Sequence, residues 1–215
     1  MTTETTEFDP DLYKRWTPRA QEEAAALLDR LKTPAKVWFC QRGRTCDGEP
    51  HDEVPYNHAR GDQWPPPFND PWMFWVLRGG RGSGKTRAGA EWVRQMSDIT
   101  PRLALIAPTS ADARDTMIEG VSGLISVCEK AHVDYRWEPS KRRFTFANGA
   151  IATTFSGEEP DRLRGPQHGA AWVDEPAHYP NIEEVWSMMM FGLRMGDRPR
   201  VAVTTTPTPI DWLKR

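Results

Sequence analysis

The sequence has few cysteines, almost no net charge and no long apolar stretch. Three cysteines among 215 residues are too few for a disulfide framework, and we expect a reducing cytoplasm. A net charge of −2 argues against a protein that coats DNA by charge alone, although local DNA contacts stay open. The central apolar run of residues 73–77 is far shorter than the ~20 residues of a membrane span. No basic-then-apolar leader is seen at the N-terminus, so we expect neither a membrane association nor a secretory signal.

Aromatic residues and a regular alternation of short apolar segments are what the chain does contain. Ten Trp and eight Phe can fill a core, which excludes wholesale disorder. We expect strands at 72–77, 103–107, 135–137, 143–147, 150–155, 170–173 and 201–205, and helices at 18–32, 86–96, 111–127 (with a break at 120–123) and 181–191. Asn148-Gly149 predicts a hairpin between two of these strands. Strands that alternate with helices indicate an α/β fold, a mainly parallel sheet with helices on both faces.

A glycine-rich loop joins the first of these strands to its helix. It satisfies the pattern G-x-x-x-x-G-K-[ST], in which backbone N–H groups and the helix N-terminus form a nest for phosphate. Lys85 is expected to reach the β- and γ-phosphates, and the Thr86 hydroxyl to bind Mg²⁺. The alternative is a plain glycine-rich turn between strand and helix. The predicted nucleotide-binding residues of the loop are Gly79, Gly80, Arg81, Gly82, Ser83, Gly84, Lys85 and Thr86.

Two acidic residues follow a later buried strand. Asp174 suits the Mg²⁺ carboxylate and Glu175 suits the base that aligns an attacking water, which favours hydrolysis over transfer to a small acceptor. The alternative is a helix that simply starts after a strand. A third strand ends in Thr204-Thr205-Thr206, where hydroxyl groups could sense the γ-phosphate; a threonine-rich strand end is also common without such a role.

Four blocks in order resemble the ATPase half of the large terminase subunits of tailed phages and gene transfer agents. They are LRGGRGSGKTRAGAEWVR, IAPTSADARDTMIEGVSG, RLRGPQHGAAWVDE and FGLRMGDRPRVAVTTTPTP, and the resemblance covers about residues 57–215. It implies a P-loop NTPase of the additional-strand (ASCE) type, with a strand inserted between the phosphate-loop strand and the Asp174 strand. It also implies an ATPase that threads double-stranded viral DNA through a portal into a procapsid.

The resemblance assigns further residues. Thr204, Thr205 and Thr206 match the motif that couples hydrolysis to DNA movement. Arg164 matches the arginine that similar motors present to a neighbouring subunit's ATP, although a structural salt bridge is the alternative. Arg81 could instead act near the γ-phosphate of its own subunit. Arg60 and Gln63 match an adenine-side segment, or belong to a polar loop that only packs.

The resemblance also implies partners and a domain plan. We expect an N-terminal extension at 1–56 and the ATPase domain at 57–215, with the family's nuclease domain absent from this chain. The implied partners are double-stranded DNA, the portal of the procapsid, the small terminase subunit and further copies in a ring, although the isolated domain could be monomeric. The implied place of action is the host cell cytoplasm, at the portal.

Two cysteines and two histidines gather in the irregular segment before residue 60. Cys40, Cys46, His51 and His58 are separated by five, four and six residues, which is looser than in common zinc motifs. Structural Zn²⁺ is one interpretation. Two buried thiols with two surface imidazoles is the other, and Cys128 is expected in the core.

Other functions stay open from the sequence. A P-loop helicase or other DNA translocase would share Lys85, Asp174 and Glu175. A P-loop phosphotransferase would need an acceptor pocket, and Glu175 argues against it. A nucleotide-binding adaptor without turnover would be indifferent to the substitution Glu175→Gln.

Overall fold

The computed structural model of the chain describes residues 38–39, 47, 49–52 and 58–207. The strands are β1 (Phe74–Arg78), β2 (Arg102–Ala107), β3 (Tyr135–Glu138), β4 (Arg143–Phe146), β5 (Ile151–Ser156), β6 (Ala170–Asp174) and β7 (Arg200–Thr205). The α-helices are α3 (Lys85–Ser97), α4 (Ser110–Asp112), α5 (Leu124–Lys130) and α6 (Ile182–Gly192). Short 3-10 helices are η2 (Gly61–Gln63), η4 (Pro139–Lys141), η5 (Pro160–Leu163) and η6 (Pro176–His178), and η3 (Ala113–Ile118) is a π-helix. The helix predicted at 18–32 lies outside the described residues.

One sheet of seven strands runs through these elements in the order β1-β7-β6-β2-β5-β4-β3. The pairs β1–β7, β7–β6, β6–β2 and β2–β5 are parallel, and the pairs β5–β4 and β4–β3 are antiparallel. The predicted α/β class with a mainly parallel sheet is therefore confirmed. Strand β7 lies between β1, which leads into the phosphate loop, and β6, which ends at Asp174. The inserted strand that the family resemblance implies is β7.

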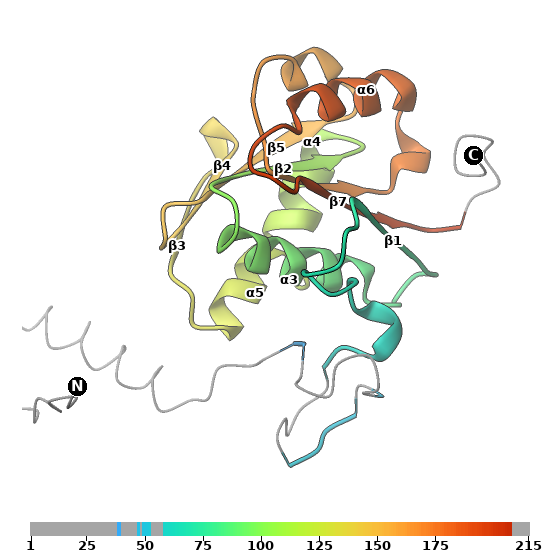
Figure 1. Ribbon diagram of the computed structural model, residues 1–215, viewed down its shortest axis with the longest axis vertical. Coiled ribbons are helices and arrows are strands. Elements are labelled where there is room, and N and C mark those ends of the chain that lie inside the picture. Colours follow the sequence, from blue (N-terminus) through green and yellow to red (C-terminus); the bar gives the residue numbers. More distant parts are fainter. Residues whose placement is uncertain (1–37, 40–46, 48, 53–57, 208–215) are drawn as a thin grey trace, which may run out of the picture. The chain divides into compact units, whose positions relative to one another are not determined.

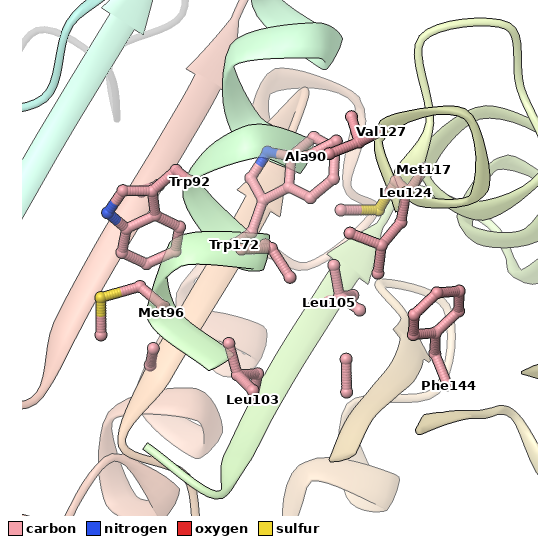
Figure 2. Packing of buried hydrophobic residues seen from close by; sticks show 14 of the residues in the cluster. Ala90, Trp92, Met96, Leu103, Leu105, Met117, Leu124, Val127, Phe144 and Trp172 are labelled. Atoms are coloured by element: carbon pink, nitrogen blue, oxygen red, sulfur yellow. The ribbon is translucent and has the colours of Figure 1, made fainter. Parts of the chain in front are cut away.

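Each face of the parallel part of the sheet carries its own apolar core, because successive side chains of a strand point to opposite faces. On one face, Leu103, Leu105 and Trp172 pack with residues of α3, η3 and α5, as Figure 2 shows. On the other face, Ile106 and Val173 pack with residues of α6. Figure 1 shows α3 and α5 on one side of the sheet and α6 on the other. Helices thus cover both faces, as expected.

Two local features test the expected connections. Asn148-Gly149 turns β4 into β5 as predicted, with Gly149 at φ +84° and its N–H donated to the Phe146 carbonyl at 2.9 Å. The segment expected as one helix over 111–127 does break near Gly120–Gly123, but its first half is a turn of α-helix followed by the π-helix. The segment is helical as predicted, but residues 113–118 form a π-helix and not an α-helix. Thr109 starts this segment, and its hydroxyl accepts the Asp112 N–H at 3.0 Å.

Arg200 at the start of β7 anchors the proline-rich segment that precedes β1. Its guanidinium lies 5.1 Å from the centre of the Phe68 ring and 4.4 Å from that of Trp72, and it donates to the Phe68 carbonyl. The stacked guanidinium is buried, and this burial lowers its pKa. The contact joins the segment before β1 to the strand beside β1. No helix within the described part of the chain is both long and apolar enough to cross a lipid bilayer.

Candidate active site

The phosphate loop is shaped by glycines at its tightest points. Gly82 and Gly84 have φ of +74° and +84°, values that residues with a Cβ rarely adopt, and Gly84 caps the start of α3. A Cβ on Gly79 would lie 2.5 Å from the Ser83 Oγ, so the loop also closes on itself there. Gly79 donates its N–H to the Thr205 carbonyl at 3.1 Å, which ties the loop to the end of β7. The described geometry brings residues 79–86 together as strand, loop and helix N-terminus.

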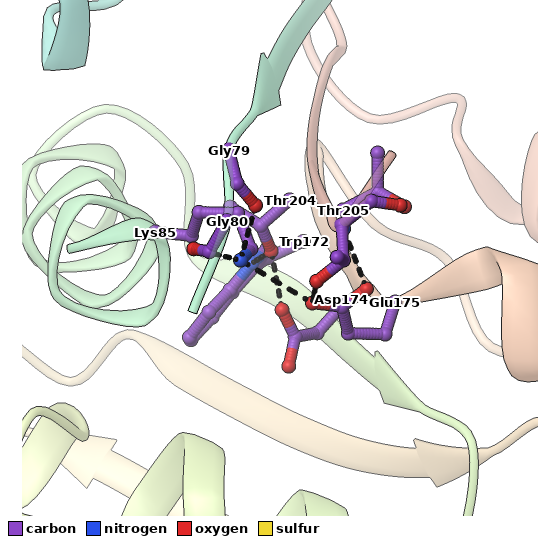
Figure 3. A network of polar contacts seen from close by, with 9 residues as sticks. Gly79, Gly80, Lys85, Trp172, Asp174, Glu175, Thr204 and Thr205 are labelled. Carbon is purple, nitrogen blue, oxygen red and sulfur yellow. Dashed lines mark hydrogen bonds and ion pairs between the residues drawn. The ribbon is translucent and has the colours of Figure 1, made fainter. Parts of the chain in front are cut away.

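Lys85 is folded over this loop. Its Nζ donates to the carbonyls of Gly79 at 2.8 Å and Gly80 at 3.1 Å, and lies 3.5 Å from Glu175 Oε1 (Figure 3). The side chain is only 9% exposed, so the ammonium is held near the loop and the Glu175 carboxylate together. The predicted phosphate ligand and the predicted base therefore belong to one site.

The register of the sheet brings the acidic pair to the threonines. Asp174 of β6 is paired with Thr204 of β7, and Leu77 of β1 is paired with Thr204 from the other side. All three strands are parallel, so their carboxyl ends meet at one edge of the sheet, where ligands of open α/β sheets bind. The predicted coupling residues consequently lie between the phosphate loop and the acidic pair.

Asp174 is buried and held by a hydroxyl. The Thr204 Oγ1 donates to Asp174 Oδ1 at 2.5 Å. Burial raises the pKa of Asp174 to about 6, while the Thr204 hydrogen bond acts in the opposite direction and the Glu175 charge adds to the rise. The carboxyl group is thus costly to ionise in this position, and a cation beside it would offset that cost.

Glu175 is held by the threonine that directly follows β7. Thr206 donates its N–H to Oε2 and its hydroxyl to Oε1, both at 2.7 Å. The backbone of Glu175 has φ +47°, an uncommon conformation for a residue with a side chain. Its N–H donates to the Thr204 carbonyl at 2.7 Å, which fixes this turn. The carboxylate is oriented by the residue that follows β7, not by the strand that precedes Glu175.

A cavity of about 590 Å³ opens beside the phosphate loop, within the size range of small-molecule sites. Its walls are residues 82–87 on one side and Asp115, Thr116 and Gly120–Ser122 on the other. The buried Ser83 Oγ finds no hydrogen-bond partner among the described residues, so the loop has a polar atom left for a ligand. The hydroxyl of Thr86 and the carboxylate of Asp174 are hard oxygen donors of the kind Mg²⁺ takes. The residues present fit a phosphate group with Mg²⁺.

Arg60 and Gln63 lie against the outer side of the phosphate loop. The Gln63 amide donates to the Ser83 carbonyl at 2.7 Å and accepts the Arg60 N–H at 2.9 Å, and it is 2% exposed. Arg60 is exposed, reaches the same Ser83 carbonyl at 3.3 Å and pairs with Asp62 at 3.2 Å. Gln63 therefore braces the loop, and its assignment to adenine stays a prediction.

The two predicted catalytic arginines are on the surface. Arg164 follows η5 with its side chain 68% exposed and lies 3.4 Å from Asp161, so the salt-bridge alternative is present in a weak, exposed form. Arg81 is exposed within the phosphate loop. Neither position tests the proposed contact with a γ-phosphate.

The predicted zinc group is only partly described. Cys40 and Cys46 lie outside the described residues. The His51 and His58 rings meet with their Nε2 atoms 3.2 Å apart, and no group of three or more potential metal ligands occurs in the described ranges. The zinc hypothesis stays a prediction. Cys128 is buried as expected, and burial raises the pKa of its thiol to about 12.

Two contributors to the site were not identified from the sequence. The Trp172 Nε1–H donates to Thr204 Oγ1 at 2.7 Å, directly behind the bond from Thr204 to Asp174 (Figure 3). Gly89 lets α3 approach Trp172 so closely that a Cβ would lie 2.3 Å from the ring. From the sequence, a tryptophan in an apolar strand is expected to be a core residue. Only the register of the sheet shows that its indole N–H contacts Thr204.

The chain resembles known proteins both in sequence and in fold. The sequence profile of the family described as "Terminase large subunit, T4likevirus-type, N-terminal" matches residues 76–215. The fold is similar to the large terminase from a thermophilic bacteriophage, with a TM-score of 0.57 and 16% identity over 68% of this chain and 36% of that one. It is also similar to the N-terminal domain of the DNA packaging ATPase from bacteriophage phi29, with a TM-score of 0.50 and 12% identity over 64% of this chain and 75% of that one.

The ATPase domain of a Thermus phage large terminase aligns with 21% identity and a TM-score of 0.48, over 65% of this chain and 61% of that domain. This chain thus spans less than two thirds of the length of that domain and of the thermophilic phage terminase. No curated protein sequence matches the chain significantly.

Proposed function

Since the chain belongs to the family of phage large terminase subunits, of which it carries the N-terminal region, we propose that it hydrolyses ATP to drive double-stranded viral DNA into a procapsid. The observation that carries the proposal is the meeting of three strand ends, which sets Lys85 3.5 Å from Glu175 and ties Glu175 to Thr206 at 2.7 Å. This arrangement supplies a phosphate-binding cation, a base and a link between them at one site. A protein that only binds nucleotide would need the phosphate-binding cation and neither of the other two.

Each residue would have a definite task in hydrolysis. The loop N–H groups and Lys85 would bind the phosphates, so Lys85 Nζ would exchange the carbonyls of Gly79 and Gly80 for phosphate oxygens. Thr86 and Asp174 would hold Mg²⁺, the latter through water. Bound Mg²⁺ would supply charge neutralisation between the β- and γ-phosphates. Glu175 would orient a water and accept its proton.

The threonines at the end of β7 would couple the reaction to movement. Thr206 holds both carboxylate oxygens of Glu175, and Thr204 holds Asp174. A change in either carboxylate is thereby transmitted to β7 through short hydrogen bonds. Because β7 also receives the Gly79 N–H at the Thr205 carbonyl, the phosphate loop and the acidic pair act on the same strand end.

The wider setting follows from the family. The phi29 relative is the N-terminal domain of a DNA packaging ATPase. We extend this to the present chain as partners: double-stranded DNA, the procapsid portal, the small terminase subunit and further copies in a ring, acting in the host cytoplasm. Residues 57–215 would form the ATPase domain and 1–56 an N-terminal extension. In such a ring the exposed Arg164 would reach a neighbour's ATP, and Arg60 and Gln63 would lie on the adenine side.

The decisive test compares two matched substitutions, Glu175→Gln and Glu183→Gln. Glu183 is an exposed residue of the first turn of α6, outside the site. We expect Glu175→Gln to bind ATP in a filter or calorimetric assay yet to hydrolyse at least about 100-fold more slowly, since a positioned base contributes about 10²–10⁴-fold. Glu183→Gln should match the wild type. A Glu175→Gln variant that hydrolyses ATP at the wild-type rate would contradict the proposal. Wild-type protein that binds ATP without hydrolysing it would favour an adaptor.

A second experiment addresses Arg164. If it acts on a neighbouring subunit, the specific ATPase activity of the wild type should rise with protein concentration. Arg164→Ala should abolish that rise, since an arginine finger can contribute about 10³–10⁵-fold. Activity that is independent of concentration and of Arg164 would show that the site is complete within one chain.

A further inference from the structure

The hydrogen bond from Trp172 to Thr204 is the structural basis for a role that no sequence motif assigns. We propose that Trp172 is a positioning residue for the metal-holding carboxylate: its indole N–H fixes the Thr204 hydroxyl as a donor to Asp174. The inference rests on the proposed function, because Asp174 holds a metal only if the site binds nucleotide with Mg²⁺. Trp172 acts on the Asp174 carboxylate through the Thr204 side chain, which bonds to both.

The direction of the hydrogen bonds follows from the chemistry of the groups. An indole Nε1–H can only donate, so Thr204 Oγ1, 2.7 Å away, must accept from it. A hydroxyl has one proton, which is then directed to Asp174 Oδ1 at 2.5 Å. Both threonine and tryptophan are fully buried, so water does not compete for either bond. Oδ2 of the carboxylate accepts no bond from another described residue, so this oxygen would be the one to hold the cation.

The position of the indole ring is set by packing. Trp172 points from β6 into the core under α3, where Gly89 leaves room for it and for no Cβ (Figure 2). The helix that packs on the ring is the one that begins with Lys85 and Thr86. The indole therefore joins the helix of the phosphate loop to the carboxylate, through Thr204. Groups that orient a metal ligand in this way typically control metal affinity about 10–100-fold.

The core offers a matched control. Trp92 of α3 is as fully buried as Trp172, but its Nε1–H has no hydrogen-bond partner among the described residues. Replacing either tryptophan by phenylalanine removes an indole N–H and part of a ring from the same core. Only Trp172→Phe removes a bond in the chain that leads to Asp174. A general packing effect would appear in both variants, and a positioning effect in one.

The experiment measures metal affinity with a non-hydrolysable ATP analogue and Mn²⁺, read by calorimetry and by the paramagnetism of free Mn²⁺. We expect Trp172→Phe to weaken Mn²⁺ binding by about tenfold, Thr204→Val by at least as much, and Thr204→Ser to restore it, since serine keeps the hydroxyl. Trp92→Phe should bind as the wild type does. In steady-state kinetics the Mg²⁺ concentration for half-maximal rate should rise for Trp172→Phe, with little change in KM for ATP.

A second readout does not depend on metal or turnover. The Trp172 indole N–H resonance, assigned in the nuclear magnetic resonance spectrum of the wild type from its through-space contacts, should shift in Thr204→Val and return in Thr204→Ser. This measurement covers the case in which Trp172→Phe does not fold. An unshifted resonance in Thr204→Val, or equal Mn²⁺ affinities in Trp172→Phe and Trp92→Phe, would overturn the inference. Wild-type protein that binds metal and analogue but shows no hydrolysis would refute the proposed function alone, and absence of metal binding would refute both.

Discussion

Replacing Asp174 by asparagine should stabilise the nucleotide-free protein at neutral pH. Burial raises the pKa of this carboxyl from 3.8 in the unfolded reference to about 6 in the folded chain. Between these two values the folded protein binds more protons than the unfolded one, so the free energy of unfolding falls as the pH rises from 4 to 6. Above pH 6 the folded state carries the whole cost of an ionised buried group. Asparagine removes that charge, and its carbonyl can still accept the bond from Thr204.

The magnitude follows from the shift. A shift of about two units corresponds to about 3 kcal/mol at 1.36 kcal/mol per unit. For a chain of this size, 1 kcal/mol moves the midpoint of thermal unfolding by roughly 2–4 °C, so Asp174→Asn should unfold about 6–12 °C higher at pH 7. The gain should vanish near pH 4, where both forms of residue 174 are neutral. His168, whose pKa burial lowers to about 4, makes folding less favourable in acid, but it contributes equally to both proteins and cancels in the difference.

The assay is thermal and urea unfolding of wild type and Asp174→Asn from pH 4 to 8, without nucleotide or divalent metal. Asp197→Asn is the control, because Asp197 is exposed and its loss should change stability by no more than about 0.5 kcal/mol. Mg²⁺ with an ATP analogue should stabilise the wild type and have far less effect on Asp174→Asn. A variant less stable than the wild type at pH 7, or a difference independent of pH, would refute the argument that burial makes this charge costly.

Three further substitutions test the packing that supports the site, each by urea unfolding. Gly89→Ala should cost about 1–3 kcal/mol or more, because the new Cβ would lie 2.3 Å from the Trp172 ring; a neutral effect would show that α3 can shift. Arg200→Lys should cost about 1–3 kcal/mol, because an ammonium cannot stack on the faces of Phe68 and Trp72 as the planar guanidinium does; full stability would mean that these ring contacts contribute nothing. Glu91→Gln should lower the free energy of unfolding by about 3 kcal/mol, because the carboxylate is 1% exposed and receives two bonds from Arg87. A loss below about 1 kcal/mol, the size expected of an exposed ion pair, would refute this.

Much of the fold could be predicted from the sequence because its signals are local. The strand before Gly79, the loop itself and the helix from Lys85 are determined by apolar residues, glycines and a helix start within a few turns of chain. The hairpin at Asn148-Gly149 is equally local. All seven expected strands are present, with ends shifted by at most two residues, because each is bounded by proline, glycine or charged residues.

The π-helix at Ala113–Ile118 could not be predicted in this way. Its apolar residues, Ala113, Met117 and Ile118, are too few to separate the spacing of a π-helix from that of an α-helix, and the i→i+5 hydrogen bonds leave no mark in composition. Gln63 is a similar case. Its amide chemistry allows an adenine contact, yet the structure shows it bound to the Ser83 carbonyl, a contact between residues 20 apart that depends on how the segment before β1 folds back. A local sequence pattern does not indicate contacts between residues this far apart in the chain.

The strand order explains why the site's polar contacts were harder to foresee than its residues. Asp174 and Glu175 are adjacent in the chain, but Asp174 is held by Thr204 of β7 and Glu175 by Thr206, the residue after β7, 30 and 31 residues away. Those pairings exist only because β7 lies between β1 and β6, in the register that sets Thr204 beside Asp174. The same register places Trp172, two residues before Asp174, behind Thr204. A one-residue slip of β7 would turn Thr204 to the other face and break both bonds at once. The register of this one strand therefore decides whether a phosphate loop and an acidic pair, each recognisable alone, come together at one place in the fold.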